Sequence, residues 1–314
     1  MTHILITGGN GFIGANIVDA LARQRQHRIT VYDLYPRKFG PLPEGVEFIQ
    51  ADLSDPALVR QALVDCGAEQ VIHAAWATIH ETALKDPRAD ITANLLPTVN
   101  LLEACTYAGI QRVHFLSSGG TVYGIPSSLP VLEDAPTFPI NPYGIAKLAV
   151  EKYLEMYRHL YGLNYLVYRP SVPYGLYQNP HRRQGAVNVF TYRALRGEPI
   201  HIWGDGEVVR DYFYIGDLVS ALQAALERPQ LSGQIYNLGG GRGYSLNEII
   251  QAIQSGLGLA VEVHYEAARK FDVPAVVLDV SKAQRDLSWA PQVSLEEGIR
   301  RTAQWIQNTP ELAG

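Results

Sequence analysis

The chain has 314 residues, of which 47% are hydrophobic, a net charge of −5 and an isoelectric point near 6.0. This length suffices for one large or two modest domains around a sizeable core. The lack of a basic surplus argues against a nucleic-acid partner, because such binding relies on clustered Lys and Arg. No run approaches the roughly 20 uninterrupted apolar residues of a membrane span, and the N-terminus leads into a strand pattern rather than a signal peptide. We therefore expect a cytoplasmic protein without membrane association.

Cysteine and histidine offer no metal or disulfide pattern. Cys66 and Cys105 are too few and too isolated for a disulfide framework or a zinc site, so we expect two reduced, partly buried thiols. The nine histidines nowhere show a spacing such as His-Glu-x-x-His, and we infer no metal.

The first half of the chain alternates short apolar runs with helical patterns, a rhythm typical of a parallel sheet covered by helices on both faces. The apolar runs predict strands at residues 3–7, 28–33, 46–51, 71–75, 113–117 and 165–169. The periodic stretches between them predict helices near residues 55–64, 90–108 and 142–161. Because parallel strands are joined by right-handed crossovers, we expect a doubly wound α/β sheet of the Rossmann type.

After about Pro170 the elements become shorter and more mixed. The patterns predict helices at 186–196, 217–226 and 295–308 and a strand at 200–203. Ser245 and Glu248 form a capping box that opens another helix, and Ser281 is expected to cap the next one. We expect one domain at 1–170 and a smaller mixed α/β lobe at 171–314, with segments that return to the first domain.

A glycine-rich motif joins the first predicted strand to the helix after it. Gly8, Gly11 and Gly14 have the spacing that permits a tight turn and close approach of the backbone to a pyrophosphate at the helix N-terminus. Asp33 lies 19 residues after Gly14, where an acid accepts hydrogen bonds from the adenine ribose. Asp52 ends the third strand, where a short acid commonly meets the adenine. These features predict a dinucleotide-binding site.

The charges after the second strand bear on the choice between NAD and NADP. The carboxylate of Asp33 would repel a 2′-phosphate, which favours NAD. Arg37 and Lys38 follow closely and could instead receive that phosphate, or lie in an exposed loop. We expect NAD, with NADP as the alternative.

Tyr143 and Lys147 form a candidate catalytic pair. They lie in the first turns of a predicted helix that Asn141 and Pro142 can open, and a spacing of four puts both side chains on one face. A nearby cation stabilises phenolate, so we expect Lys147 to lower the pKa of Tyr143 and allow it to act as general acid and base.

With these motifs in order, the chain resembles an extended short-chain dehydrogenase/reductase of the NAD-dependent nucleotide-sugar epimerase/dehydratase family, from about residue 3 to residue 305. The matched motifs are the glycine motif, Tyr143-x-x-x-Lys147, His73-Ala-Ala, Val122-Tyr-Gly, Arg169-Pro-x-x-Pro-Tyr-Gly, Trp203-Gly-Asp-Gly and Arg210-Asp-Tyr.

The resemblance assigns a function to many residues. Tyr143 and Lys147 would be catalytic, with Lys147 also binding the nicotinamide ribose. The residues it places around the cofactor are Gly8, Gly11, Phe12, Ile13, Gly14, Asp33, Asp52, Leu53, Ala74, Ala75, Asn94, Ser117, Tyr143, Lys147 and Pro170. The residues it places around the nucleotide sugar are Val172, Trp203, Arg210, Arg269 and Asp272.

Some of these residues have structural interpretations as well. Arg210 and Arg269 suit phosphate oxygens, but each could pair with a carboxylate within the protein. Trp203 could stack on the nucleotide base or pack in the core. We expect His73, which ends a buried strand, to be a hydrogen-bonded structural residue rather than a proton shuttle.

Two positions depart from the family pattern. The family's catalytic Ser or Thr corresponds to Gly119, so the hydroxyl that would bond the sugar C4 oxygen must come from Ser118 or Thr121, or be absent. Either hydroxyl could instead form hydrogen bonds within the loop. The Asn usual before Pro-Tyr-Gly is Val172, which removes a polar contact expected near the diphosphate.

The resemblance implies an NAD-dependent nucleotide-sugar 4-epimerase of the UDP-glucose/UDP-galactose type, acting through a transient 4-keto sugar. An NAD(P)H-dependent 4-keto-sugar reductase is the alternative, and a non-catalytic dinucleotide-sensing protein is a remote one. A 4,6-dehydratase is disfavoured because Gly120 and Thr121 replace the family's Asp-Glu pair.

The resemblance also implies a homodimer in which helices near residues 90–108 and 142–161 of two subunits form a four-helix contact. Tyr153, Tyr157 and Tyr161 repeat at helical spacing on the second of these helices. We expect these tyrosines to serve packing or the dimer surface rather than chemistry.

Overall fold

The structure is a computed structural model that describes residues 1–78, 80–182, 184–267 and 273–312. The chain divides into two compact units, each assembled from separate segments. Unit 1 consists of Met1–Gly124, Pro136–Arg169 and Ala225–Tyr236. Unit 2 consists of Ile125–Ala135, Pro170–Ala224 and Asn237–Gly314. The sequence pattern placed residues 125–135 with the first domain, whereas here they group with unit 2.

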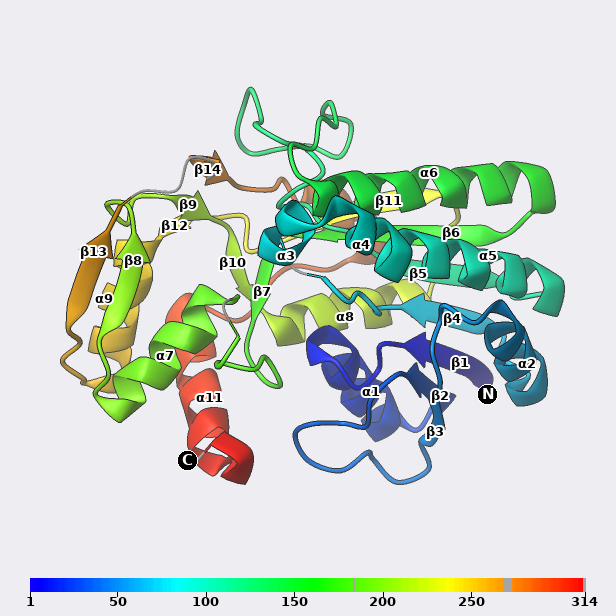
Figure 1. Cartoon of the computed structure of the whole chain (residues 1–314), viewed down its shortest axis with the longest axis horizontal. Coiled ribbons are helices and arrows are strands. Elements are labelled where there is room, and N and C mark those ends of the chain that lie inside the picture. Colours follow the sequence, from blue (N-terminus) through cyan, green and yellow to red (C-terminus); the bar gives the residue numbers. More distant parts are fainter. Residues whose placement is uncertain (79, 183, 268–272, 313–314) are drawn as a thin grey trace. The chain divides into compact units, whose positions relative to one another are not determined.

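A seven-stranded sheet forms the centre of unit 1, in the order β11-β6-β5-β4-β1-β2-β3 (Figure 1). Its strands are β1 (Thr2–Thr7), β2 (His27–Asp33), β3 (Glu47–Gln50), β4 (Gln70–His73), β5 (Arg112–Leu116), β6 (Asn164–Pro170) and β11 (Gln234–Leu238). The pairs from β3 through β6 are parallel. The inner strands are almost wholly buried, which explains their continuous apolar runs. The predicted Rossmann-type sheet is confirmed.

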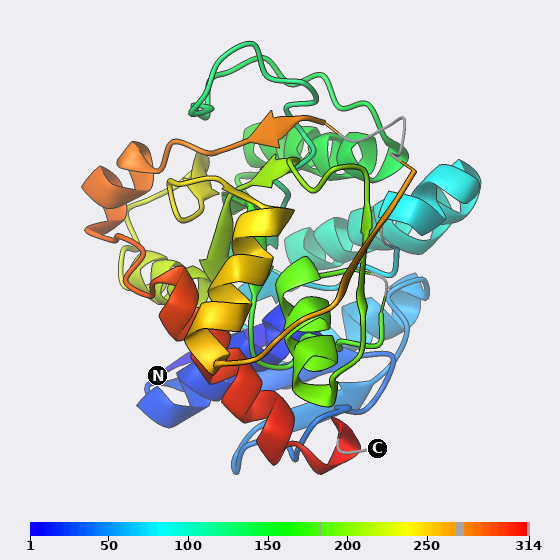
Figure 2. The same ribbon diagram turned by 90° about the vertical axis from the view of Figure 1, so that its left-hand side faces the viewer.

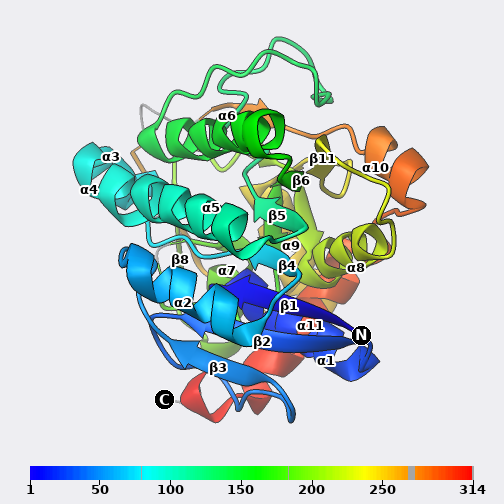
Figure 3. The same cartoon turned by 90° about the vertical axis from the view of Figure 1, so that its right-hand side faces the viewer.

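Helices cover both faces of this sheet (Figure 3). Helix α1 (Phe12–Gln24) lies on one face, and α2 (Pro56–Cys66), α5 (Leu96–Ala108) and α6 (Pro142–Tyr161) lie on the other. The core on the second face includes Leu5, Val71, Leu101, Val113 and Leu154, each no more than 1% exposed. This arrangement leaves the carboxyl ends of the strands as the edge from which the functional loops emerge.

The helix expected near residues 90–108 is divided into three parts. It consists of α4 (Pro87–Asp90), a π-helical segment η1 (Ile91–Leu95) and α5. Pro97 stands in the first turn of α5 and has no N–H to continue a regular helix, which accounts for the restart. A short helix, α3 (His80–Lys85), precedes α4.

The two predicted helix caps have different outcomes. The capping box of Ser245 and Glu248 is confirmed at the start of α9 (Leu246–Leu257). The prediction for Ser281 is wrong by one residue, because Val280 is the N-cap of α10 (Ser281–Leu287). Ser281 instead donates from its backbone and its hydroxyl to Asp279, whose carboxylate supplies the acceptor.

Unit 2 combines short strands with helices. Its strands are β7 (Val172–Tyr174) paired with β10 (Tyr212–Tyr214), β8 (Ile200–Trp203) paired with β13 (Val263–Glu266), and β9 (Val209–Arg210) between β12 (Tyr244–Ser245) and β14 (Ala275–Val276). Helices α7 (Ala186–Arg196), α9 and α11 (Leu295–Asn308) pack together, in green, yellow and red in Figure 2. Helix α8 (Ile215–Leu226) and the short η2 (Pro310–Leu312) complete the elements. Within the described part of the chain, no helix has the length and apolar character needed to cross a membrane.

Candidate active site

The glycine-rich loop lies where the strand order reverses, with β2 on one side of β1 and β4 on the other. Ligands of such sheets bind beyond the carboxyl ends of the strands at this point. Gly8 has a φ of +70°, and a Cβ there would lie 2.5 Å from the Cα of Ala75, just beyond β4. A Cβ at Gly14 would overlap the carbonyl oxygen of Gly8. Glycine therefore lets the loop close against both β4 and α1.

The N-terminus of α1 is suited to an anion. Gly11 is its N-cap residue and has no side chain with which to cap it. Phe12 and Ile13 follow in a first turn that contains no acidic residue. Backbone N–H groups and the helix dipole favour negative charge at such an end. The loop and helix therefore fit the pyrophosphate of a dinucleotide.

Asp33 ends β2 beside this loop. Its carboxylate oxygens accept hydrogen bonds from the backbone N–H groups of Asn10, at 3.0 Å, and Tyr35, at 3.2 Å. Burial raises the pKa of Asp33 above its usual value, and these hydrogen bonds oppose that effect. Asp52 is exposed by contrast, and its carboxylate accepts a bond from the N–H of Ser54.

The two basic residues that could have received a 2′-phosphate differ in their surroundings. Arg37 pairs with Asp19 of α1 at 2.7 Å, and its side chain is only 4% exposed. The Lys38 ammonium lies 5.3 Å from the ring centroid of Phe39. The carboxylate of Asp33 faces the cofactor loop, where it would repel the 2′-phosphate of NADP, and Arg37 is held by Asp19.

Helix α6 carries both candidate catalytic residues in its first two turns. Asn141 caps the helix by accepting a backbone hydrogen bond, and Pro142 stands in its first turn. Tyr143 is half-buried and Lys147 is 4% exposed. The Lys147 Nζ donates to the carbonyl oxygen of Leu116, the last residue of β5, at 2.7 Å.

Aromatic rings surround the Lys147 ammonium. Its Nζ lies 3.6 Å from the ring centroid of Trp76 and 4.9 Å from that of Phe115. The Trp76 ring also meets the ring of Tyr143 edge-on, with centroids 5.8 Å apart. A cation over an aromatic face is stabilised most when both are desolvated. Trp76 thus contacts both members of the pair.

The electrostatics of the pair differ from the prediction. Burial raises the pKa of Tyr143 above its usual value, and the carboxylate of Asp90 raises it further. Burial also lowers the pKa of Lys147 well below its usual value. The predicted lowering of the Tyr143 pKa is therefore not found for the chain by itself, because burial and the Asp90 carboxylate both raise that pKa.

Asp90, at the junction of α4 and η1, is completely buried. Its Oδ1 accepts hydrogen bonds from the Thr78 hydroxyl and from Nδ2 of Asn94, the latter at 2.9 Å. Asn94 also donates to the Thr78 hydroxyl at 2.8 Å and accepts from the N–H of Ala77 at 2.7 Å. Asn94 therefore organises the loop that follows β4.

A buried ion pair fastens α6 to the sheet. Arg169 of β6 donates to both carboxylate oxygens of Glu151, at 3.0 and 2.6 Å, and both side chains are at most 3% exposed. Ser117 donates its hydroxyl to the same carboxylate at 2.5 Å. Arg169 also donates to the Tyr123 hydroxyl at 2.8 Å. Two residues of the matched motifs, Tyr123 and Arg169, therefore take part in the contacts that hold the catalytic helix in place.

The loop after β5 contains the two candidate hydroxyls. Ser118 is 8% exposed and Thr121 is 4% exposed. Thr121 packs on the start of α6. A Cβ added at Gly144 would lie 3.1 Å from the Cβ of Thr121. The Thr121 Oγ1 is buried without a hydrogen-bond partner among the described residues. A buried hydroxyl in this state is costly unless a ligand completes its bonding.

His73 has a structural role, as predicted. Both of its ring nitrogens are hydrogen-bonded to threonine hydroxyls, Thr7 at 2.7 Å and Thr98 at 2.9 Å. Burial and the nearby Lys147 lower the pKa of His73 to about 3, so the ring is neutral at physiological pH.

The predicted substrate residues belong to unit 2. Val172 lies in β7 and is half-buried. Trp203 ends β8 and is 42% exposed, so the interpretation as core packing is wrong. Arg210 lies in β9 and donates to the carbonyl oxygen of Val209. Arg269 and Asp272 lie outside the described residues.

The remaining residues predicted around the cofactor lie at the same edge of the sheet. Leu53, Ala74, Ala75 and Ser117 follow the carboxyl ends of β3, β4 and β5, and Pro170 is the last residue of β6. The ends of these strands and the first turns of α1 and α6 together form the predicted site.

Sequence comparison identifies this arrangement. A model of the family described as "NAD dependent epimerase/dehydratase family" matches residues 4–239. The chain belongs to this family. The chain is 36% identical over 309 residues to the UDP-glucose 4-epimerase of Mycolicibacterium smegmatis, covering 97% of this chain and 98% of that relative.

Solved structures agree with this identification. A UDP-glucose 4-epimerase of Thermotoga maritima with UDP-glucose superposes with a TM-score of 0.93, at 36% identity, covering 98% of this chain and 99% of that one. A Thermus thermophilus UDP-glucose 4-epimerase in complex with NAD has a TM-score of 0.91, also at 36% identity and with the same coverage. The present chain is therefore an NAD-dependent epimerase, and the prediction of NAD as its cofactor is confirmed.

Two residues beside the catalytic pair were not anticipated. Trp76 follows the matched His-Ala-Ala motif by one residue, and Asp90 stood at the expected start of a helix. Its place directly after the His73-Ala-Ala motif is the signal that could have identified Trp76. The burial of Asp90 has no signal in the sequence, where an Asp at a helix end is ordinarily an exposed capping residue.

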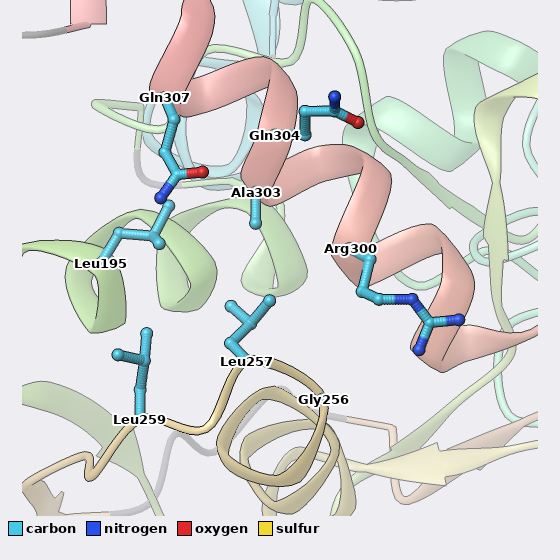
Figure 4. A pocket seen from close by; sticks show the side chains of 8 residues that line it. All are labelled: Leu195, Gly256, Leu257, Leu259, Arg300, Ala303, Gln304 and Gln307. Atoms are coloured by element: carbon cyan, nitrogen blue, oxygen red, sulfur yellow. The ribbon is translucent and has the colours of Figure 1, made fainter.

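A surface hollow of about 350 Å³ lies between α7, α9 and α11 of unit 2 (Figure 4). Leu195, Leu257, Leu259 and Ala303 provide its apolar lining, and Arg300 is its only ionisable group among the described residues. It contains none of the predicted site residues.

Proposed function

We propose that this epimerase interconverts UDP-glucose and UDP-galactose by inverting the configuration at C4 of the sugar. The observation that carries the proposal is a continuous series of contacts within unit 1. Gly8 of the cofactor loop closes against Ala75, and the next residue, Trp76, contacts Tyr143 and Lys147. The acid/base pair thus adjoins the cofactor loop, and the similarity to UDP-glucose 4-epimerases supports the sugar and the nucleotide.

The chain's residues supply the proton chemistry. NAD, when bound, accepts a hydride and returns it. Tyr143 takes the proton from the C4 hydroxyl as phenolate and later returns it, and Lys147 binds the nicotinamide ribose. Because burial raises the pKa of Tyr143, its phenolate requires added positive charge, which an oxidised nicotinamide carries.

Thr121 is favoured over Ser118 as the hydroxyl that bonds the C4 oxygen. Its Oγ1 is buried without a partner among the described residues, so a substrate oxygen would complete its hydrogen bonding. For the nucleotide part, we assign stacking to the exposed Trp203 and phosphate binding to Arg210.

We also propose a homodimer formed through α5 and α6. Tyr153, Met156 and Leu160 lie on one face of α6 and are 36%, 40% and 58% exposed, and Tyr107 of α5 is 67% exposed. Apolar side chains collected on neighbouring helices are typical of a subunit contact. Tyr157 is 6% exposed and packs in the core instead.

The test is the conversion of UDP-galactose into UDP-glucose with NAD but without added NADH. Tyr143→Phe should reduce turnover about 10²- to 10⁴-fold, because it removes the proton acceptor, and should leave NAD affinity unchanged in calorimetry. Tyr153→Phe, on the same helix, is the matched control and should retain full activity.

Two outcomes would contradict the proposal. Consumption of one NADH per sugar without interconversion would indicate a 4-keto-sugar reductase. Turnover by Tyr143→Phe equal to that of the parent chain would remove Tyr143 from the mechanism.

A further inference from the structure

The Lys147 ammonium is buried, and its immediate partners in the described part of the chain carry no formal negative charge. Among the described residues, this ammonium has one carbonyl acceptor, Leu116, and lies near three aromatic rings, those of Trp76, Phe115 and Tyr143. Rings and a single carbonyl compensate only partly for the lost hydration of a buried ammonium. A formal negative charge nearby is needed to keep such a group protonated.

Two buried carboxylates act on Lys147, those of Asp90 and Glu151. Glu151 is already balanced, because both of its oxygens accept hydrogen bonds from the guanidinium of Arg169. The positive charge of Arg169 therefore largely neutralises the Glu151 carboxylate and weakens its effect on Lys147.

Asp90, by contrast, has no positively charged hydrogen-bond donor among the described residues. Its hydrogen-bond donors, Thr78 and Asn94, are neutral, and its Oδ2 is buried without a partner among the described residues. None of the ion pairs found in the described part of the chain includes it. A fully buried carboxylate is retained only where a positive group offsets its desolvation.

The fold brings this carboxylate to the catalytic helix. Both α4, which ends at Asp90, and η1 pack against α6, which carries Tyr143 and Lys147. Local π-helical segments such as η1 are frequent at functional sites.

We propose that Asp90 is the counter-charge of the catalytic pair, a positioning residue that holds Lys147 as an ammonium and keeps Tyr143 protonated until the cofactor binds. With Lys147 and Asp90 balancing each other, a phenolate at Tyr143 becomes a third, uncompensated charge. It is compensated only when a cationic nicotinamide is present. The proposal rests on the proposed function in assigning the proton transfer to Tyr143.

The other described ionisable groups near the pair are neutral, paired or exposed. His73 is neutral and hydrogen-bonded on both nitrogens, and Glu151 is paired with Arg169. Helix α3 also packs on α6; its Lys85 is exposed, and the side chains of His80 and Glu81 lie outside those described.

The decisive variant is Asp90→Asn, which removes the charge but keeps an oxygen to accept from Thr78 and Asn94. In chains labelled with 13C at the tyrosine Cζ, the Tyr143 signal is identified by its loss in Tyr143→Phe. In chains that also carry Lys147→Met, where no change in the Lys147 charge can offset the effect, removing the negative charge should move the titration of Tyr143 at least about one pH unit lower.

Thr98→Val is the matched control, because Thr98 is buried, neutral and bonded to Asn94 and His73. It should disturb α5, the helix that follows Asp90 and η1 in the chain, without moving the Tyr143 titration. If Asp90→Asn does not fold, Asp90→Ser provides a smaller neutral substitute. An unchanged or higher titration of Tyr143 in the neutral variant would overturn the proposal. Since this titration needs no substrate, its outcome is independent of whether UDP-sugars are the substrates.

Discussion

At the scale of single residues, burial rather than proximity governs the catalytic pair. Lys147 lies four positions from Tyr143, which puts both side chains on one face of α6, yet burial raises the pKa of Tyr143 and lowers that of Lys147. Desolvation disfavours both charged forms, so each must be stabilised by another charge. This makes the pair dependent on its surroundings and explains why Trp76 and Asp90 matter.

The hydroxyl that assists Tyr143 can be identified by paired substitutions. Thr121→Val keeps the shape of the side chain but removes its hydroxyl, and we expect a loss of turnover of about 10²-fold. Ser118→Ala should have a smaller effect, because the unsatisfied buried hydroxyl is that of Thr121. Turnover numbers measured at saturating UDP-galactose compare the two variants, and a larger loss in Ser118→Ala would reverse the assignment.

At the scale of elements, α6 is held on the sheet by one buried ion pair. The Arg169 guanidinium donates hydrogen bonds to both oxygens of Glu151, and the Ser117 hydroxyl donates to the same carboxylate. The ends of β5 and β6 are thereby tied to the middle of the helix. The first turns, with Tyr143 and Lys147, are consequently placed at the carboxyl-terminal edge of the sheet.

Breaking this ion pair should destabilise the chain strongly. Glu151→Gln leaves the Arg169 charge buried without compensation, and we expect the free energy of unfolding to fall by about 3–5 kcal/mol in urea titrations. The control is Glu198→Gln, which breaks the exposed pair with Arg196 and should change stability by less than about 1 kcal/mol. Equal losses in the two variants would contradict the anchoring role.

At the scale of the whole molecule, both units are built from discontinuous segments. Residues 225–236 return to unit 1 and lead into β11 at one edge of its sheet, whereas residues 125–135 leave it for unit 2. Neither unit could therefore be produced by cutting the chain once near residue 170. The exposed apolar face of α6 is the surface on which we propose that a second subunit packs.

The proposed dimer is tested by charging this face. The parent chain should have about twice the 34.7 kDa mass of one subunit in light scattering. Leu160→Glu should halve that mass, because a carboxylate in an apolar contact is costly to desolvate. Leu58→Glu, at a comparably exposed apolar residue of α2, should leave the mass unchanged. A dimer that persists in Leu160→Glu would exclude this face.

Local patterns accounted for much of the fold and the cofactor site. The spacing of Gly8, Gly11 and Gly14, and Asp33 at the end of a strand, depend on neighbouring residues and could be read directly. The strand β11 was missed because Gln234–Leu238 is short and shows no clear alternation. Its place in the sheet depends on pairing with β6, about seventy residues earlier in the chain.

The sequence by itself determined the Rossmann-type sheet, the glycine loop and the Tyr143–Lys147 pair, because periodicity and fixed spacing are local properties. Only the tertiary structure decided the ionisation of that pair, because desolvation and charge depend on residues far apart in the chain. Trp76, Asp90 and Lys147 come from the segment after β4, the end of α4 and the helix α6, which packing of the chain brings to one site. The spacing of Tyr143 and Lys147 therefore indicates acid/base chemistry, and the buried carboxylate beside them decides when it can operate.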